Sequence, residues 1–213
     1  PQADLDASLE RGARALGVAL DPAQRATLLA YLAVLERWNR AYNLTAVRDP
    51  AEMVPRHILD SLPVLPYLHG ERIVDVGSGA GLPGLPLAMA RPKYRFLLLD
   101  SASKRIAFLN HAIARLGLSN VTIAQARVKD YDGKAGFDTM ISRAFSSLAD
   151  FVSWSGHLCA PGGRLLAMKG RIDPGEVANL PAGWQLDQTR RLRVPGLDGE
   201  RHLLEIVPRS AGC

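Results

Sequence analysis

The chain has 213 residues, of which 47% are hydrophobic and 22% are charged, so it can bury a proper core. Its net charge of +5 permits an anionic partner such as RNA without requiring one. The two cysteines, Cys159 and Cys213, lack a metal-binding spacing, which argues against a disulfide scaffold or a zinc site. The sequence contains no apolar run long enough to span a membrane, and we expect no signal peptide from its first residues. We therefore expect a cytoplasmic protein with no metal and no membrane partner.

The first 66 residues are predicted to be helical, because their apolar residues recur with a spacing near 3.6. One helix is expected over residues 5–16, ending at Gly17. Asp21 and Pro22 give the cap and first turn of a second helix, and Asp49-Pro50 repeats this signal for a third that carries His57. We expect residues 1–66 to form a helical extension packed on the rest of the chain.

From Arg72 onward, short β-rich runs alternate with helical segments. This alternation predicts an α/β fold, with a mostly parallel, twisted sheet and helices on both of its faces. Pro161-Gly162-Gly163 is expected to break the chain before the fifth strand, and two final strands are expected to add an antiparallel hairpin near one edge. We expect residues 67–213 to form this single domain. Its strands are predicted at residues 73–76, 95–99, 121–124, 137–141, 164–168, 184–194 and 202–207.

A glycine-rich loop follows the first predicted strand, where open α/β sheets bind their ligands. Gly79, Gly81 and Gly84 match the dinucleotide pattern GxGxxG. Counted from Gly77, directly after the strand, the spacing is instead GxGxG. Asp75, inside the strand, would also sit poorly beside a pyrophosphate and suits a cationic ligand better. The loop therefore favours S-adenosylmethionine, and the alternatives are a dinucleotide or a tight turn that binds nothing.

Asp100 ends the second predicted strand, about 20 residues after the glycines. A carboxylate at this position can accept hydrogen bonds from both ribose hydroxyls of a nucleoside. We expect no adjacent arginine to neutralise it, which favours a free 2′-hydroxyl. Asp100 could also cap the following helix, alone or in addition to binding a ribose.

Several further segments resemble the bacterial glucose-inhibited division protein B family, the small-subunit ribosomal RNA guanine-N7 methyltransferases. The resemblance runs in order from about Leu28 to Val207. It implies a class I methyltransferase fold, S-adenosylmethionine as the cofactor, and 16S ribosomal RNA as the partner, in the small subunit or an assembly intermediate. We expect the enzyme to be a monomer. The segments that carry the resemblance are Asn43-Leu44-Thr45, Arg56-His57-Ile58-Leu59-Asp60-Ser61, Ile141-Ser142-Arg143-Ala144-Phe145, Lys169-Gly170 and Leu197-Asp198-Gly199-Glu200-Arg201-His202.

The resemblance also implies functional residues. Those expected at the cofactor are Gly77, Ser78, Gly79, Leu82, Asp100, Ser101, Val128, Lys129 and Arg143. Those expected on the substrate side are Asn43, His57, Arg127, Arg143 and Arg201. Lys129 departs from the family, in which an acid is more common at this position. The arginines could instead be surface charges, and His57 could simply pack in the helical region.

Guanine N7 carries no proton and offers an in-plane lone pair, so its methylation needs no general base. Orientation and electrostatics would then suffice for an in-line transfer. A cytosine-C5 enzyme would need a nucleophilic cysteine, and neither cysteine is placed for attack. The alternatives are a methyltransferase for a small molecule or a protein, an NAD-dependent oxidoreductase, and an RNA-binding module without catalytic activity.

Overall fold

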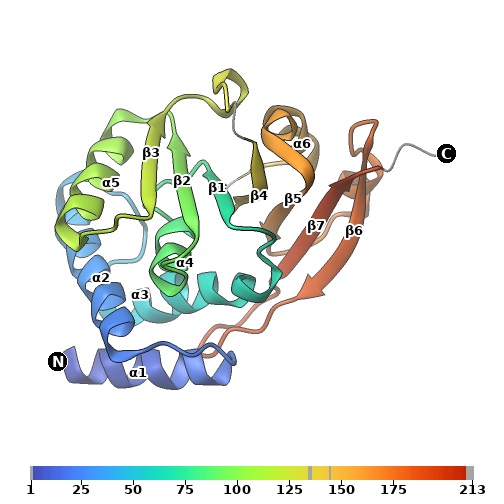
Figure 1. Ribbon diagram of the computed structural model, residues 1–213. Coiled ribbons are helices and arrows are strands. Elements are labelled where there is room, and N and C mark those ends of the chain that lie inside the picture. Colours follow the sequence, from blue (N-terminus) through green and yellow to red (C-terminus); the bar gives the residue numbers. More distant parts are fainter. Residues whose placement is uncertain (1, 134–135, 144, 210–213) are drawn as a thin grey trace.

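The computed structural model describes residues 2–133, 136–143 and 145–209 (Figure 1). Its described strands form one seven-stranded sheet in the order β3-β2-β1-β4-β5-β7-β6. The first five strands are parallel, and β7 runs antiparallel to both of its neighbours. The strands are β1 (Arg72–Val76), β2 (Arg95–Asp100), β3 (Val121–Gln125), β4 (Phe137–Ser142), β5 (Cys159–Lys169), β6 (Trp184–Arg191) and β7 (His202–Pro208).

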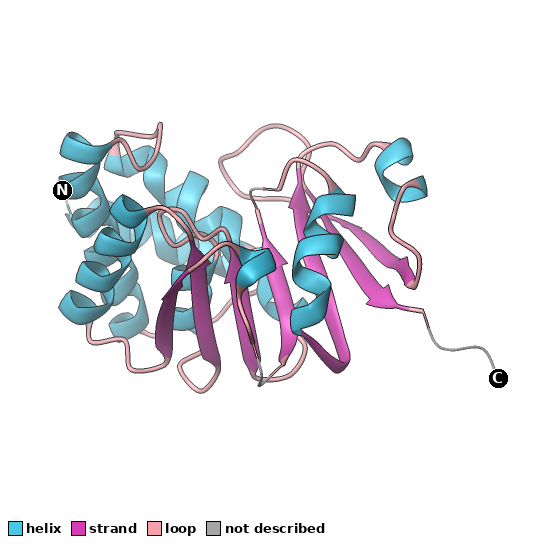
Figure 2. Cartoon of the chain, turned by 90° about the horizontal axis from the view of Figure 1, so that it is seen from above, coloured by secondary structure: helices cyan, strands magenta, loops and turns pink. Residues whose placement is uncertain are grey.

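Helices cover both faces of the sheet, as Figure 2 shows. Alternate residues of each central strand enter different cores. Ile73 of β1 belongs to the core that also contains residues of α1, α2, α4 and α5, whereas Val74 and Val76 belong to the core that contains residues of α6. The helices are α1 (Gln2–Ala15), α2 (Pro22–Tyr42), α3 (Pro50–Met53), α4 (Gly84–Ala90), α5 (Ser103–Leu116), α6 (Leu148–Ser155) and α7 (Pro174–Ala178). Shorter turns are η1 (Val54–Leu59), η2 (Leu62–Tyr67), η3 (Val128–Asp130) and η4 (Gly156–Leu158).

The N-terminal helices share a core with one face of the sheet. Leu28, Leu32 and Leu35 of α2 are buried in the same cluster as Phe96 and Leu98 of β2. The predicted start of α2 is confirmed by a capping box, in which the Asp21 carboxylate accepts from the backbone N–H of Gln24 and the backbone N–H of Asp21 donates to the side-chain oxygen of Gln24. The helical extension is therefore packed directly behind the strands that end at the glycine loop.

The structure corrects three details of the sequence prediction. The fifth strand begins at Cys159 rather than at residue 164, because a shift in register between Phe137 and Thr139 accommodates the Pro-Gly-Gly segment inside the strand. The third helix is not continuous, since α3 passes into a π-helical turn that contains Pro55. The strand β6 ends at Arg191, three residues before the predicted end at Val194.

Candidate cofactor and substrate site

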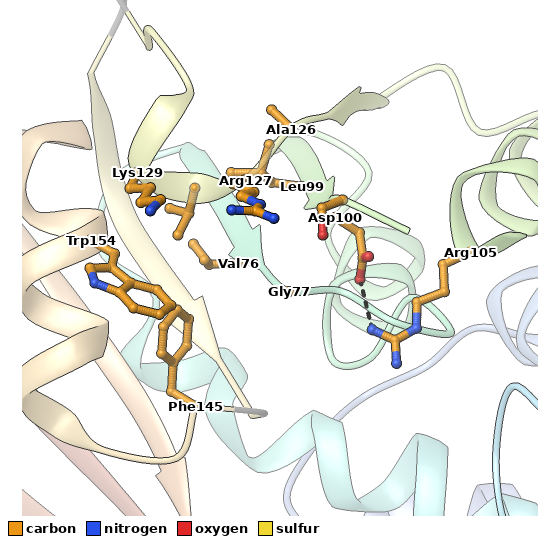
Figure 3. Close-up of a pocket in the computed structure, with 12 residues that line it drawn as sticks. Val76, Gly77, Leu99, Asp100, Arg105, Ala126, Arg127, Lys129, Phe145 and Trp154 are labelled. Atoms are coloured by element: carbon orange, nitrogen blue, oxygen red, sulfur yellow. Dashed lines mark hydrogen bonds and ion pairs between the residues drawn. The ribbon is translucent and has the colours of Figure 1, made fainter. Parts of the chain in front are cut away.

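A cavity of about 340 Å³ lies at the carboxyl ends of β1, β2 and β3 (Figure 3). The topology explains its position, because parallel strands bring their carboxyl ends to one edge of the sheet. Polar side chains from β2 and the loop after β3 face aromatic side chains that follow β4. The lining residues are Val76, Gly77, Leu99, Asp100, Ser101, Arg105, Ala126, Arg127, Val128, Lys129, Phe145 and Trp154.

The glycine loop turns away from β1 with positive φ angles at Gly77 (+73°) and Gly79 (+58°). A Cβ atom at either position would meet no other atom within 4 Å. The space above the loop is therefore open to a ligand, and glycine is needed here for its backbone conformation. The backbone N–H groups of Gly77 and Ser78 both donate to the carbonyl of Leu99, at 2.8 and 3.2 Å, which ties the loop to the end of β2.

The carboxylate of Asp100 connects the loop to helix α5. One oxygen accepts from the backbone N–H of Gly79 and the other from that of Ala102, both at 2.9 Å. Because Ala102 is the N-cap of α5 and has no side-chain cap of its own, Asp100 satisfies a backbone donor at the start of this helix. The expectation that no arginine stands beside it is wrong. The first turn of α5 brings Arg105 Nη1 to 3.4 Å from Asp100 Oδ2.

Asp75 lies beneath the loop, with none of its surface exposed. Its Oδ2 accepts from the backbone N–H of Gly84 at 2.8 Å, and its Oδ1 is buried with no hydrogen-bond partner in the described part of the chain. The pKa of this carboxyl is raised from 3.8 to about 8, mainly by burial; Asp100 adds to the rise, while the Gly84 hydrogen bond and Arg143 oppose it. An unpartnered acidic oxygen under an open glycine loop fits a ligand that carries positive charge, as S-adenosylmethionine does.

The predicted cofactor residues divide into three groups. Gly77, Asp100, Ser101, Val128 and Lys129 line the cavity. Others shape the loop from below or pack in the core. The hydroxyl of Ser78 donates to the carbonyl of Asp75, and the backbone N–H of Gly79 donates to Asp100. Leu82 is buried among apolar side chains. Arg143 lines a neighbouring cavity instead.

That second cavity has a volume of about 250 Å³ and is mostly polar in its side chains. The carboxylate of Asp60 joins two of the predicted arginines there, accepting from Arg201 Nε at 2.6 Å and from Arg143 Nη1 at 3.4 Å. Sequence reasoning gave Asp60 no role, although the acid belongs to a segment that carries the family resemblance. The lining residues are Asp60, Arg143, Met168, Lys169, Gly170, Leu192, Glu200, Arg201 and His202.

The segment after β4 contributes a residue to each of the two cavities. Arg143 lines the second cavity, and Phe145, two residues later, lines the first. The ammonium group of Lys169, at the end of β5, donates to the carbonyls of Phe145 and Ser146 at 3.4 and 3.3 Å and so holds this segment. Ala144 lies outside the described residues.

The remaining substrate-side predictions fall in different surroundings. Arg127 is exposed and faces the first cavity beside Lys129 (Figure 3). Asn43 ends α2 with φ +50°, and its side-chain oxygen accepts from Arg48. His57 is 3% exposed, its Nε2 lies 3.0 Å from the hydroxyl of Thr45, and burial lowers its pKa to about 4. Neither Asn43 nor His57 lines either cavity, so each has a visible structural role and a substrate role that stays a prediction.

Phe145 and Trp154 are cavity residues that sequence reasoning did not select. Their rings meet edge to face with centroids 5.8 Å apart, and Trp154 is 43% exposed. The cysteine at the start of β5, Cys159, pairs with the beginning of β4 and therefore lies at the other end of the sheet from Arg143. Burial raises its pKa to about 11, which suits an unreactive thiol. Cys213 lies outside the described residues.

The fold and the glycine loop facing an acid at the end of β2 define a class I methyltransferase. Solved methyltransferases share this fold. The O-methyltransferase TomG from Streptomyces achromogenes is 17% identical with a TM-score of 0.57, covering 91% of this chain and 92% of that chain. A putative methyltransferase from Thermoplasma acidophilum is also 17% identical, with a TM-score of 0.53, covering 67% and 70%.

The particular family follows from the sequence comparisons. Residues 24–204 match the family model for rRNA small subunit methyltransferase G. Ribosomal RNA small subunit methyltransferase G of Nitrosococcus oceani is 51% identical over 204 residues, covering 96% of this chain and 95% of that relative. Its counterpart in Escherichia fergusonii is 50% identical over 192 residues, covering 90% and 93%. The chain belongs to this family, so the predicted resemblance is confirmed, and the methyltransferase prediction is confirmed over the oxidoreductase alternative.

Within residues 2–133, 136–143 and 145–209, no helix combines the length and apolar character that a bilayer crossing requires. In the same ranges, no group of three or more His, Cys, Asp or Glu side chains is arranged to hold a metal ion.

Proposed function

We propose that this protein transfers a methyl group from S-adenosylmethionine to N7 of a guanine in the 16S ribosomal RNA of the small subunit. The observation that carries the proposal is that the segment after β4 lines two cavities, one through Phe145 and the other through Arg143. One is lined by Gly77 of the glycine loop and by Asp100, and the other is lined by Arg143 and Arg201. Relatives that are about half identical carry the name ribosomal RNA small subunit methyltransferase G.

The first cavity suits the cofactor in shape and in charge. Bound S-adenosylmethionine supplies a methyl group on a cationic sulfur. Asp100 is placed to accept hydrogen bonds from ribose hydroxyls, while its contacts to Gly79 and Ala102 fix its orientation. The open face of the loop at Gly77 admits the ligand closely, and Asp75 beneath it supplies a carboxyl that a positive charge favours in its ionised form.

The residues at the second cavity favour a mechanism without a general base. N7 of guanine has no proton to lose, so the protein has to hold the base in line and balance charge. Arg143 and Arg201 can donate hydrogen bonds to guanine O6 or to a phosphate, and they do not act as bases in the ordinary pH range. His57 is a poor base for this step, because it is buried away from both cavities and its pKa is lowered to about 4.

The exposed cations around the cavities support RNA as the substrate. Arg127 and Lys129 stand together at the rim of the first cavity, next to the exposed ring of Trp154. Such cations attract phosphates in a manner that weakens with salt. We assign Arg127 to phosphate contacts at this rim, and we retain Asn43 and His57 as residues that shape the substrate side through the segment between α2 and η1.

The test is methyl transfer from labelled cofactor to small ribosomal subunits that lack the modification. We expect incorporation of label at N7 of one guanine, located by mapping the labelled nucleotide. Free guanosine and unrelated proteins serve as alternative acceptors in parallel reactions. Transfer to either of these in place of the subunit, or label at another atom, would contradict the proposal.

A further inference from the structure

The carboxylate of Asp60 is shared by two arginines that are remote in sequence. Arg201 Nε donates to Oδ1 at 2.6 Å across 141 residues, and Arg143 Nη1 donates to Oδ2 at 3.4 Å across 83 residues. The three side chains are only 16%, 25% and 30% exposed, for Asp60, Arg201 and Arg143 respectively. Three separate parts of the fold therefore converge on one partly buried carboxylate at the wall of the second cavity.

The charges at this cavity do not balance. One carboxylate faces two guanidinium groups, which leaves one positive charge in excess. The other charged groups have different partners, since Lys169 pairs with Glu176 at 3.0 Å and Glu200 lies 3.9 Å from Arg171. A partly buried cation without a counterion is costly, so this cavity favours an anionic ligand.

The contacts of Arg201 also fix which of its atoms remains available. Its Nη1 donates to the carbonyls of Asp198 and Gly199 at 3.0 and 3.3 Å, and its Nε is taken by Asp60. Among the described residues, Nη2 has no hydrogen-bond partner. The carboxylate and the loop thus hold the guanidinium in one orientation with a donor to spare.

We propose that Asp60 is a positioning residue, which holds Arg143 and Arg201 as a paired receptor for one phosphodiester of the substrate RNA. This inference rests on the proposed function, because the RNA supplies the phosphate. Asp60 itself touches neither the phosphate nor the methyl group. Its effect is to keep the two guanidinium groups in a fixed orientation, so that the nucleotide beside the phosphate is held next to the segment after β4.

The experiment compares Asp60→Asn with wild type in single-turnover methylation of unmodified small subunits. The amide keeps the size of the side chain, but it carries no negative charge to neutralise the arginines and has one acceptor oxygen in place of two. We expect turnover to fall by at least about tenfold, as misplacement of catalytic groups produces. Affinity for S-adenosylhomocysteine should stay unchanged, and affinity for the subunit should not weaken, because the variant has lost a negative charge.

Asp6→Asn is the matched control. It breaks another partly buried pair, in which Arg25 Nε donates to Asp6 at 2.9 Å between α1 and α2, away from both cavities. Turnover of this variant should equal that of wild type. A drop in subunit affinity equal to the drop in turnover for Asp60→Asn, or turnover within about twofold of wild type, would overturn the proposal.

A second variant tests directly whether Arg201 contacts a phosphate, and it does not depend on the folding of Asp60→Asn. Arg201→Gln should lower the slope of log affinity against log salt by about one, the loss expected for one phosphate contact. An unchanged slope would overturn the proposal. If wild type itself transfers no methyl to the subunit, the proposed function fails; if wild type is active and these variants behave like it, the inference about Asp60 alone fails.

Discussion

The hydroxyl of Tyr31 donates a hydrogen bond of 2.8 Å to the carbonyl oxygen of Ala80 in the glycine loop. Tyr31 belongs to α2 and has none of its surface exposed, and burial raises its pKa. The N-terminal helical region therefore does more than cover one face of the sheet. It provides a buried hydrogen-bond donor for the glycine loop beside the first cavity.

Tyr31→Phe should lower the free energy of unfolding by about 1–3 kcal/mol, because the buried carbonyl of Ala80 loses its partner. The affinity for S-adenosylhomocysteine should fall with it, since the loop is less firmly held. Chemical denaturation and calorimetric titration give the two quantities. Tyr42→Phe is the control, because Tyr42 is 46% exposed, and equal behaviour of the two variants would remove any special role for Tyr31.

Gly79→Arg should abolish binding of S-adenosylhomocysteine. The side chain would extend into the open space above the loop, where a Cβ atom at Gly79 meets nothing within 4 Å. Gly17→Arg is a matched control, since Gly17 also has positive φ (+70°) and open space around it, but lies in the turn after α1. Both variants carry similar backbone strain, so normal binding by a folded Gly79→Arg protein would contradict the assigned cofactor position.

Much of this arrangement could be predicted from sequence because it depends on local patterns. The strand-loop-helix signal around Gly77 and the acid that ends β2 are each readable within about 30 residues of chain. The third helix shows the limit of such patterns. A capping signal at Asp49 and Pro50 identified its start, but the π-helical turn around Pro55 depends on how the segment packs against α1 and α3.

The long-range pairs could not be predicted in the same way. Asp60 meets Arg201 across 141 residues, and no local pattern indicates which acid a given arginine will contact. The burial of His57 and the closeness of Arg105 to Asp100 likewise follow from packing and helix geometry. The sequence indicated which residue types gather at the sheet edge, whereas the structure shows that they divide between two cavities.

Asp100→Ala should weaken binding of S-adenosylhomocysteine by roughly 1–3 kcal/mol, the scale for leaving a charged hydrogen bond unmade. Arg105→Ala is the informative comparison, because this half-exposed partner lies 3.4 Å from the same carboxylate. If the carboxylate binds the ribose, Arg105→Ala should have a much smaller effect. Normal binding by a stable Asp100→Ala protein would leave Asp100 with its structural contacts to Gly79 and Ala102 alone.

The pH dependence of stability should reveal the buried carboxyl of Asp75. Its pKa is raised from 3.8 to about 8, so the folded protein holds a proton between these values that the unfolded chain has released. The stability that this group contributes is therefore complete below about pH 4 and is lost as pH rises through about 8. His57, whose pKa is lowered to about 4, acts in the opposite direction between its ordinary value of 6.5 and about 4.

Asp75→Asn separates the two effects, because His57 is common to both proteins. The free energy of unfolding of wild type minus that of the variant should decline between about pH 4 and pH 8. Urea denaturation at a series of pH values in the absence of cofactor measures this difference. A difference that does not change over this range would show that Asp75 titrates near its ordinary pKa and that burial does not control it.

Arg143→Ala should lose turnover far more than stability. Arg143 is partly exposed and lines the second cavity, so its removal leaves the core intact, whereas the proposed receptor loses one of its two cations.

Because N7 carries no proton, the single-turnover rate of wild type with saturating cofactor should show no essential ionisation between about pH 6 and 9. His57 titrates near pH 4, below this range, and arginine stays charged throughout it. The same profile recorded on Asp75→Asn identifies any contribution from that carboxyl. A rate that follows one deprotonation near neutrality in both proteins would contradict the mechanism without a base, and full activity of Arg143→Ala would contradict the site.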